Sequence, residues 1–427
     1  MGTNSANVAN GSNVLRNGNF RRLYIAAVTS SGGAAVAVVS VSWLVYTETG
    51  SAIAITYVGL ASIVPGLVLG LVAGALADRY NRRRVMVLSD LTRAALMGGL
   101  AASLYLAGFH LLTVLGVLVV VNSFSALFLP ASSAFLPRLV DREGLEAANG
   151  LLQGSTQGAQ MIGSAAGGAV IAAAGVVPGL AVNALTYVVS AVCVLSIAAT
   201  FGQTPGSIGG APARASMFHD IREGLAYMRD HLAVLEVTLG FLPGNLLWTM
   251  ITSFTVVYSA AYFAASAGAY GYLVAALGGG FALGAFLAIR LRPRSHAGLV
   301  MCLCVIVQGV AALALAFSHV YALSIALVVV LGGGAGLINA TYASTMQAIV
   351  PNRLLGRVLS VDLVGSFAGI PAGLIVGGFL ASDFGIGFSY SVAGLGLLAN
   401  GLGMLALRDL RRLGYSVGRP PTDSPSA

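Results

Sequence analysis

The sequence predicts an all-α membrane protein with twelve transmembrane helices, arranged as two pseudo-symmetric six-helix bundles. Apolar residues make up 57% of the 427 residues and charged residues only 8%, which is too few charges for a soluble protein of this size. Apolar segments of about 20 residues, the length that crosses a bilayer, recur from Arg22 to Arg408. A motif that recurs in part 210 residues later supports the division into two bundles.

Polar or turn-rich breaks separate the predicted spans. The spans of the first half cover residues 22–47, 53–77, 85–108, 111–136, 147–173 and 177–200, and those of the second half cover 233–262, 268–290, 297–318, 320–349, 355–382 and 386–408. The first span is longer than a cleaved secretory signal and is expected to remain as a helix. The resulting domains are an N-terminal segment (1–21), a first bundle (22–200), a linker with a surface helix (201–232), a second bundle (233–408) and a disordered tail (409–427).

The loops between these spans differ in charge. Arginine, which supplies all of the positive charge, is concentrated in alternate loops, including Arg138, Arg290 and Arg353. The opposite loops carry Glu48 and Asp383 instead. Because cytoplasmic loops hold the positive charge of membrane proteins, both termini are expected to be cytoplasmic. These short basic loops form no continuous basic face, which excludes a nucleic-acid partner.

A glycine-spaced apolar run ends at an acid and a group of arginines between the second and third spans. It begins Gly70-Leu-Val-Ala-Gly74, reaches Asp78-Arg79, and closes with Asn-Arg-Arg-Arg at Arg84. Glycines four residues apart allow another helix to approach closely. Gly280 and Gly284 precede a second arginine group, but no acid equivalent to Asp78 follows them.

This run resembles the signature between the second and third helices of major facilitator transporters. The likeness covers essentially the whole chain and is closest to the branch of macrolide-efflux and enterobactin-exporter-like proteins; its further pieces are Phe128–Ala131, Ala148–Leu151 and Gln347–Pro351. The resemblance implies a transporter of the bacterial inner membrane that moves a small molecule, acts as a monomer and needs no cofactor. In such transporters the acid matching Asp78 locks a cytoplasmic gate.

The resemblance therefore assigns gate residues and close-packed glycines. The gate residues are Gly74, Asp78, Arg79, Arg82 and Arg83. The alternative is that the arginines only determine topology. Ser164 replaces the proline usual in the fifth-helix exporter motif, which weakens that hallmark of antiporters. The glycines expected to pack helices are Gly70, Gly163, Gly167, Gly280 and Gly284.

Few ionisable groups lie within the spans. The candidates for proton coupling are Asp90, Asp362 and Glu48, since an ionisable residue in a membrane span is expensive and usually functional. Asp90 and Arg93 are three residues apart and can pair on one helix face. Each of these acids is interpreted as a near-surface or paired group rather than as a proton carrier at the membrane midplane.

Neutral polar residues recur at helical spacing and predict a large, aromatic-rimmed cavity. The alternative is that these polar residues only form hydrogen bonds between helices and do not contact a ligand. Pro243 is expected to interrupt the seventh helix just before the polar residues there. A neutral cavity suits an amphipathic, mostly uncharged solute better than a phosphate or a dicarboxylate, which would call for buried arginine or lysine. The candidate cavity residues are Trp43, Tyr46, Asn122, Gln153, Gln157, Gln160, Asn245, Thr249, Asn339 and Tyr342.

The leading interpretation is a secondary active transporter that exports a drug-like or siderophore-like molecule by rocking of the two halves, with proton antiport. Uptake of a neutral solute is the alternative within transport. A membrane-embedded enzyme is disfavoured because the five histidines form no metal-ligand pair such as HExxH, and the three cysteines lie in apolar runs. A receptor without transport would leave the polar stripes unexplained. No metal site is predicted.

Overall fold

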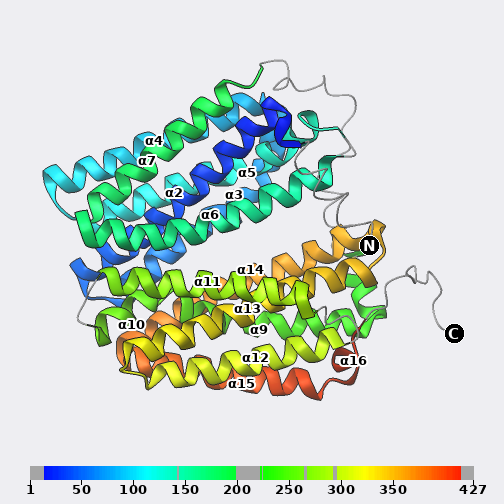
Figure 1. Cartoon of the computed structure of the whole chain (residues 1–427). Coiled ribbons are helices and arrows are strands. Elements are labelled where there is room, and N and C mark those ends of the chain that lie inside the picture. Colours follow the sequence, from blue (N-terminus) through cyan, green and yellow to red (C-terminus); the bar gives the residue numbers. More distant parts are fainter. Residues whose placement is uncertain are drawn as a thin grey trace. The chain divides into compact units, whose positions relative to one another are not determined.

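A computed structural model describes residues 14–141, 144–198, 222–223, 225–263, 267–291 and 296–414. The side chains of residues 71–79, 146, 352–353, 356, 359–360 and 362–368 lie outside this description. All regular secondary structure in the described ranges is helical (Figure 1). The surface helix predicted at 217–229 lies partly outside these ranges, and residues 225–230 are helical. The N-terminal residues 1–13 and the tail from 415 onward lie outside them.

Six long helices form the first half of the chain. They are α2 (Gly18–Thr49), α3 (Ala52–Arg79), α4 (Arg82–Ala107), α5 (Leu111–Phe135), α6 (Leu145–Ala174) and α7 (Val176–Leu195). A 3-10 turn, η1 (Leu136–Arg138), follows α5. The sixth helix ends at Leu195 rather than at the expected residue 200, because the chain turns at Ser196.

The second half contains the same number of long helical spans. They are α9 (Leu232–Thr252) with α10 (Thr255–Tyr262), α11 (Ala267–Leu291), α12 (Ala297–Ala316), α13 (Tyr321–Ile349), α14 (Asn352–Asp383) and α15 (Ile386–Ala406), followed by the short α16 (Arg408–Arg411). The expectation that Pro243 interrupts the seventh helix is wrong. Helix α9 continues through Pro243, and the break lies at Ser253 and Phe254, where α10 begins.

Ten helical segments of the described chain are long and apolar enough to cross a membrane. Helix α6 is not among them, because it carries three glutamines and many glycines. Helix α14 contributes a shorter apolar stretch, Gly369–Asp383. Together with these two helices, the described chain contains twelve long helical spans, as the sequence predicts.

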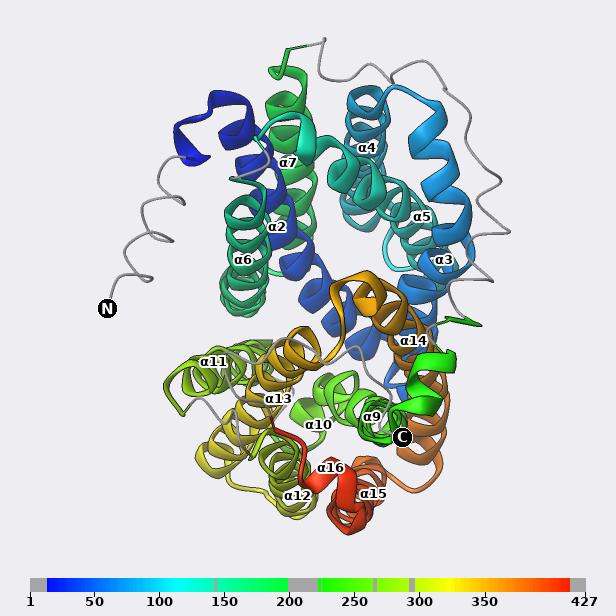
Figure 2. The ribbon, with the colours of Figure 1, turned by 90° about the vertical axis from the view of Figure 1, so that its right-hand side faces the viewer.

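The chain divides into two compact units, each of which is a bundle of helices. In the first unit, α2 packs against α6 and α7, and α4 packs against α5 and α7, as Figure 2 shows. In the second unit, α12 packs against α13 and α15, and α9 packs against α14 and α15. The first unit contains the cavities described below.

The two units repeat one mode of helix packing. In the first unit, a Cβ placed on Gly163 of α6 would overlap the carbonyl oxygen of Gly32, and one on Gly167 would lie 3.1 Å from the Cα of Val36, both on α2. In the second unit, Gly373 and Gly377 of α14, each 210 residues later, also meet α9, and a Cβ on Gly377 would in addition approach the ring of Phe254. Their partners on α9 are Leu246 and Met250, each 214 residues after Gly32 and Val36.

Candidate functional site

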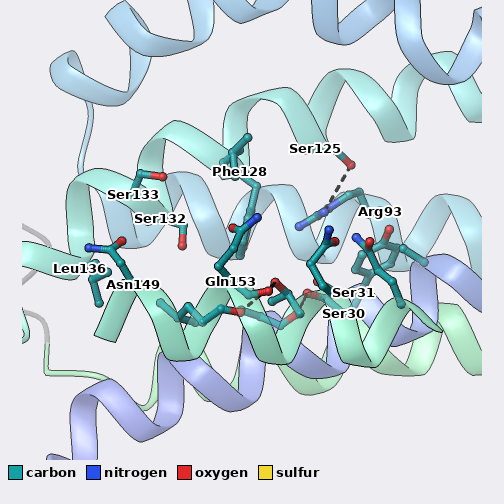
Figure 3. Close-up of a pocket in the computed structure, with 18 residues that line it drawn as sticks. Ser30, Ser31, Arg93, Ser125, Phe128, Ser132, Ser133, Leu136, Asn149 and Gln153 are labelled. Carbon is teal, nitrogen blue, oxygen red and sulfur yellow. Dashed lines mark hydrogen bonds between the residues drawn. The ribbon is translucent and has the colours of Figure 1, made fainter. Parts of the chain in front are cut away.

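A cavity of about 550 Å³ with a mixed polar and apolar lining lies within the first unit (Figure 3). Five helices supply its walls: α2, α4, α5, α6 and α7. Its size falls in the range of pockets that bind small organic molecules. The polar lining residues are Ser30, Ser31, Arg93, Ser125, Ser132, Ser133, Asn149, Gln153, Thr156, Gln157, Gln160 and Tyr187.

Helix α6 supplies the longest polar wall of this cavity. Lining residues recur every three or four positions from Asn149 to Gln160, which is the period of one helix face. At 1.5 Å per residue this face extends for about 17 Å. Gln153, Gln157 and Gln160, which were predicted as cavity residues, are all on it. Their amide groups can both donate and accept hydrogen bonds.

A buried ion pair lies on α4 beside the cavity. One guanidinium nitrogen of Arg93 donates to Oδ1 of Asp90, one turn earlier on the same helix. The hydroxyl of Ser190 on α7 donates to Oδ2 of Asp90 at 2.7 Å. Asp90 is fully buried and Arg93 is 5% exposed. The pair that the spacing predicted is therefore formed, but in the interior of the bundle rather than near a surface.

Two aromatic rings enclose the guanidinium of Arg93. Its Cζ lies 4.7 Å from the ring centroid of Phe128 on α5 and 4.4 Å from that of Tyr187 on α7. The same guanidinium donates to Ser125 at 3.3 Å, as Figure 3 shows, and to the carbonyl of Ser89 at 3.3 Å. Arg93 also lines the cavity. The interpretation of a cavity without buried arginine therefore has to be corrected, since this arginine comes from the third span and not the fourth.

A second cavity of about 100 Å³ lies in the same unit and shares the lining residues Tyr187 and Ala34 with the first. It contains Asn122, which was predicted as a cavity residue, and Asn183 of α7. Asn183 is 1% exposed, and among the described residues neither atom of its amide has a hydrogen-bond partner. Such an amide indicates a place for water or for a polar ligand group.

The motif after the second span contributes helix caps. Asn81 is the N-cap of α4, and its side chain accepts a hydrogen bond from the backbone N–H of Arg84 at 3.1 Å. Arg82 donates to the carbonyl of Ala134 at 2.9 Å, and Arg83 donates to the carbonyls of Val194 and Leu195. These carbonyls lie in the last turns of α5 and α7, where intrahelical donors are missing. The side chains of Gly74, Asp78 and Arg79 lie outside the described residues.

The other predicted residues are dispersed over the two units. On α2, Trp43 is buried and stacks on Tyr270, Tyr46 is half-buried, and Glu48 is exposed. The side chain of Asp362 lies outside the described residues. The hydroxyl of Thr249 and the amide of Asn339 donate to carbonyls one turn earlier in their own helices, and Tyr342 lies edge-on to Phe241. Six of the predicted cavity residues line neither of the two described cavities: Trp43, Tyr46, Asn245, Thr249, Asn339 and Tyr342.

The predicted packing glycines also differ from one another. Besides Gly163 and Gly167, Gly280 and Gly284 on α11 face the backbone of α13, where a Cβ would overlap the carbonyl oxygens of Val329 and Gly333. At Gly70, a Cβ would meet no described atom within 4 Å.

The sequence reasoning missed the serines of α2 and α5 and the two rings around Arg93. Ser125, Phe128 and Ser132 recur at helical spacing on α5, and this spacing could have indicated that they share one helix face. The described residues contain no cluster of three or more potential metal ligands among histidine, cysteine and acidic side chains.

A family model described as "Transmembrane secretion effector" matches residues 10–414 of the chain. The chain belongs to this family of major facilitator transporters. It is 29% identical to the multidrug efflux pump Tap of Mycolicibacterium fortuitum, over 92% of this chain and 96% of that protein. It is 28% identical to the enterobactin exporter EntS of Shigella boydii, over 92% of each chain.

Solved structures of this superfamily share the fold. A mutant of the nucleoside transporter NupG matches with a TM-score of 0.70 at 12% identity, over 91% of this chain and 99% of NupG. A bacterial homologue of the lysosomal transporter Spinster, in an inward-facing and occupied conformation, matches with a TM-score of 0.63 at 14% identity, over 90% and 94% of the two chains. From the family match, the protein is a multi-pass membrane transporter with a small-molecule substrate.

Proposed function

We propose that this major facilitator transporter exports a drug-like or siderophore-like molecule from the bacterial cytoplasm. The observation that carries the proposal is the cavity of about 550 Å³, which combines serine, threonine and glutamine side chains with the rings of Phe128 and Tyr187. Such a mixed lining suits an amphipathic solute. Relatives of similar length that are named as a multidrug efflux pump and an enterobactin exporter support export over uptake.

The proposed mechanism is alternating access by a monomer in the inner membrane, with both termini cytoplasmic. The two units would rock around the bound solute, and Asp78 would stabilise one end state. Inward movement of protons would drive export, with Asp90, Asp362 and Glu48 as the acids to test. Asp90 lies beside the cavity, through its ion pair with Arg93.

Export is tested in cells that lack their other pumps. Retention of a panel of drugs and siderophores would be compared between cells with the wild-type protein, with Asp78→Asn and with Asp383→Asn. Asp383 is an exposed acid at the end of α14 and serves as the matched control. We expect the wild type and Asp383→Asn to lower retention of at least one compound, and Asp78→Asn to lose that effect. If retention of every compound is independent of the protein, export is excluded, and a rise in retention would instead indicate uptake.

The proton drive is tested separately with purified protein in vesicles. We expect an imposed pH gradient to accelerate movement of the exported compound, and its collapse to slow it. Export that does not respond to the gradient would exclude proton antiport while leaving export itself intact.

A further inference from the structure

We propose that the cavity selects solutes that present a carboxylate or another group rich in hydrogen-bond acceptors, and that it discriminates against cationic amphiphiles. This inference rests on the proposed function, because it names the substrate class of the same cavity. The observation that supports the inference is the orientation of the Asp90–Arg93 ion pair relative to the cavity. Arg93 is part of the cavity wall, whereas Asp90 is fully buried behind it and is not part of the wall.

The positions of the two charges determine which of them lies nearer to a ligand in the cavity. Asp90 is held away from the cavity from two sides, by the Arg93 guanidinium and by the hydroxyl of Ser190 on α7. A solute in the cavity therefore approaches the positive end of the pair, with the negative end behind it. In a site of low dielectric, this order attracts acceptors and repels ammonium groups.

Among the described lining residues, no opposing charge faces the solute from the other walls. Among the described residues that line the cavity, Arg93 is the one charged side chain, and the phenol of Tyr187 is the one other group that can ionise. The serine, threonine, asparagine and glutamine side chains of α2, α5 and α6 are neutral. The local field at the wall is therefore that of the Asp90–Arg93 pair, whose positive end is nearer to the solute.

The guanidinium of Arg93 is also fixed in an orientation from which it can donate hydrogen bonds to a ligand. The rings of Phe128 and Tyr187 fix the guanidinium by cation–π contact, so little side-chain freedom is lost when a ligand binds. Its contact with Ser125, at 3.3 Å, is longer than the usual distance for a charged donor. A ligand carboxylate can replace this weak acceptor, and it can accept two hydrogen bonds from the planar guanidinium.

The test compares three probes of one shape: naphthoate, naphthamide and naphthylmethylammonium. Binding of each to the purified full-length protein is measured by titration calorimetry in detergent at neutral pH. We expect naphthoate to bind most tightly and the ammonium least tightly. Hydrogen bonds to a charged group predict that Arg93→Gln weakens naphthoate binding by at least about tenfold.

Two variants separate charge from folding. Asp90→Asn removes the negative end of the pair and should tighten naphthoate binding, whereas Arg84→Gln, an exposed arginine that does not line the cavity, should leave all three affinities unchanged. Because Arg93→Gln leaves a buried carboxylate without its partner, the double variant Asp90→Asn/Arg93→Gln is included and should lose the preference among probes while remaining folded.

The inference is overturned if the ammonium binds as tightly as naphthoate, if no probe binds, or if the folded double variant keeps the preference. Failure of the proposed function is distinguishable from these results. The predicted order of binding without any export in cells would exclude the exporter and leave the selectivity standing. Export of cationic drugs without the predicted order of binding would exclude the selectivity and leave the exporter standing.

Discussion

The hydroxyl of Ser190 donates a hydrogen bond of 2.7 Å to Oδ2 of Asp90, which joins α7 to α4 in the interior of the first unit. Both residues are fully buried. Since Arg93 donates to the other oxygen of the same carboxylate, each oxygen of Asp90 has a donor. A buried carboxylate is tolerated only with such partners, so these three residues form one structural unit.

We expect Ser190→Ala to lower the free energy of unfolding by about 1–3 kcal/mol, because a carboxylate oxygen then loses its donor inside the bundle. Thermal unfolding of the purified protein in detergent measures the loss. The control is Ser123→Ala, since Ser123 is half-buried and its hydroxyl donates to the carbonyl of Val119 in its own helix. Equal stability of the two variants would contradict the role assigned to Ser190.

Removal of one member of the ion pair should be worse than removal of both. Asp90→Asn and Arg93→Gln each leave a buried charge without its partner, with an expected loss of about 3–5 kcal/mol for breaking such a pair. The double variant leaves no buried charge and should recover part of this loss. A double-mutant cycle by thermal unfolding provides the coupling energy, and additive losses would show that the two side chains act independently.

Gly163 should not tolerate a side chain. The added methyl group of Gly163→Ala would overlap the backbone of α2 at Gly32, with an expected loss of about 1–3 kcal/mol. Gly158→Ala on the same helix is the matched control, because a Cβ there meets no described atom within 4 Å. That control should stabilise α6 by about 0.5–1 kcal/mol, since alanine favours a helix over glycine. A stable Gly163→Ala variant would argue against direct backbone contact.

The smaller cavity should hold ordered water at Asn183. A volume of about 100 Å³ accommodates about three water molecules at about 30 Å³ each. Radiolytic labelling, which modifies side chains next to bound water, should oxidise Met97, a buried residue that lines this cavity. Met86 is equally buried in a hydrophobic cluster and should stay unmodified. Asn183→Leu should abolish labelling of Met97, and labelling that persists would place the water elsewhere.

The helices and their order could be predicted from the sequence because a bilayer requires long apolar segments with polar breaks. The bounds of the described helices lie within five residues of the predicted spans. The break in the seventh span was misplaced because proline was weighted as the strongest breaker. Helix α9 accommodates Pro243, and the chain bends instead at Ser253 and Phe254.

The cavity was only partly predictable for a different reason. Polar stripes show which face of a helix is polar, so Gln153, Gln157 and Gln160 could be found on α6. They do not show which stripes from different helices converge. The roles of Arg93 and Tyr187 depend on tertiary packing of α4 against α5 and α7, and apolar sequence carries little information about that packing.

Because the glycine contacts are repeated, one half of this protein can serve as an internal control for the other. The same substitution can be made at Gly163 and at Gly373, in the same local geometry and in the same molecule. The halves are not copies in chemistry, however, because Val300 and Leu303 stand 210 residues after Asp90 and Arg93. If the substitution affects stability equally at both contacts but transport only at Gly163, the asymmetry of transport lies in the half that carries the ion pair.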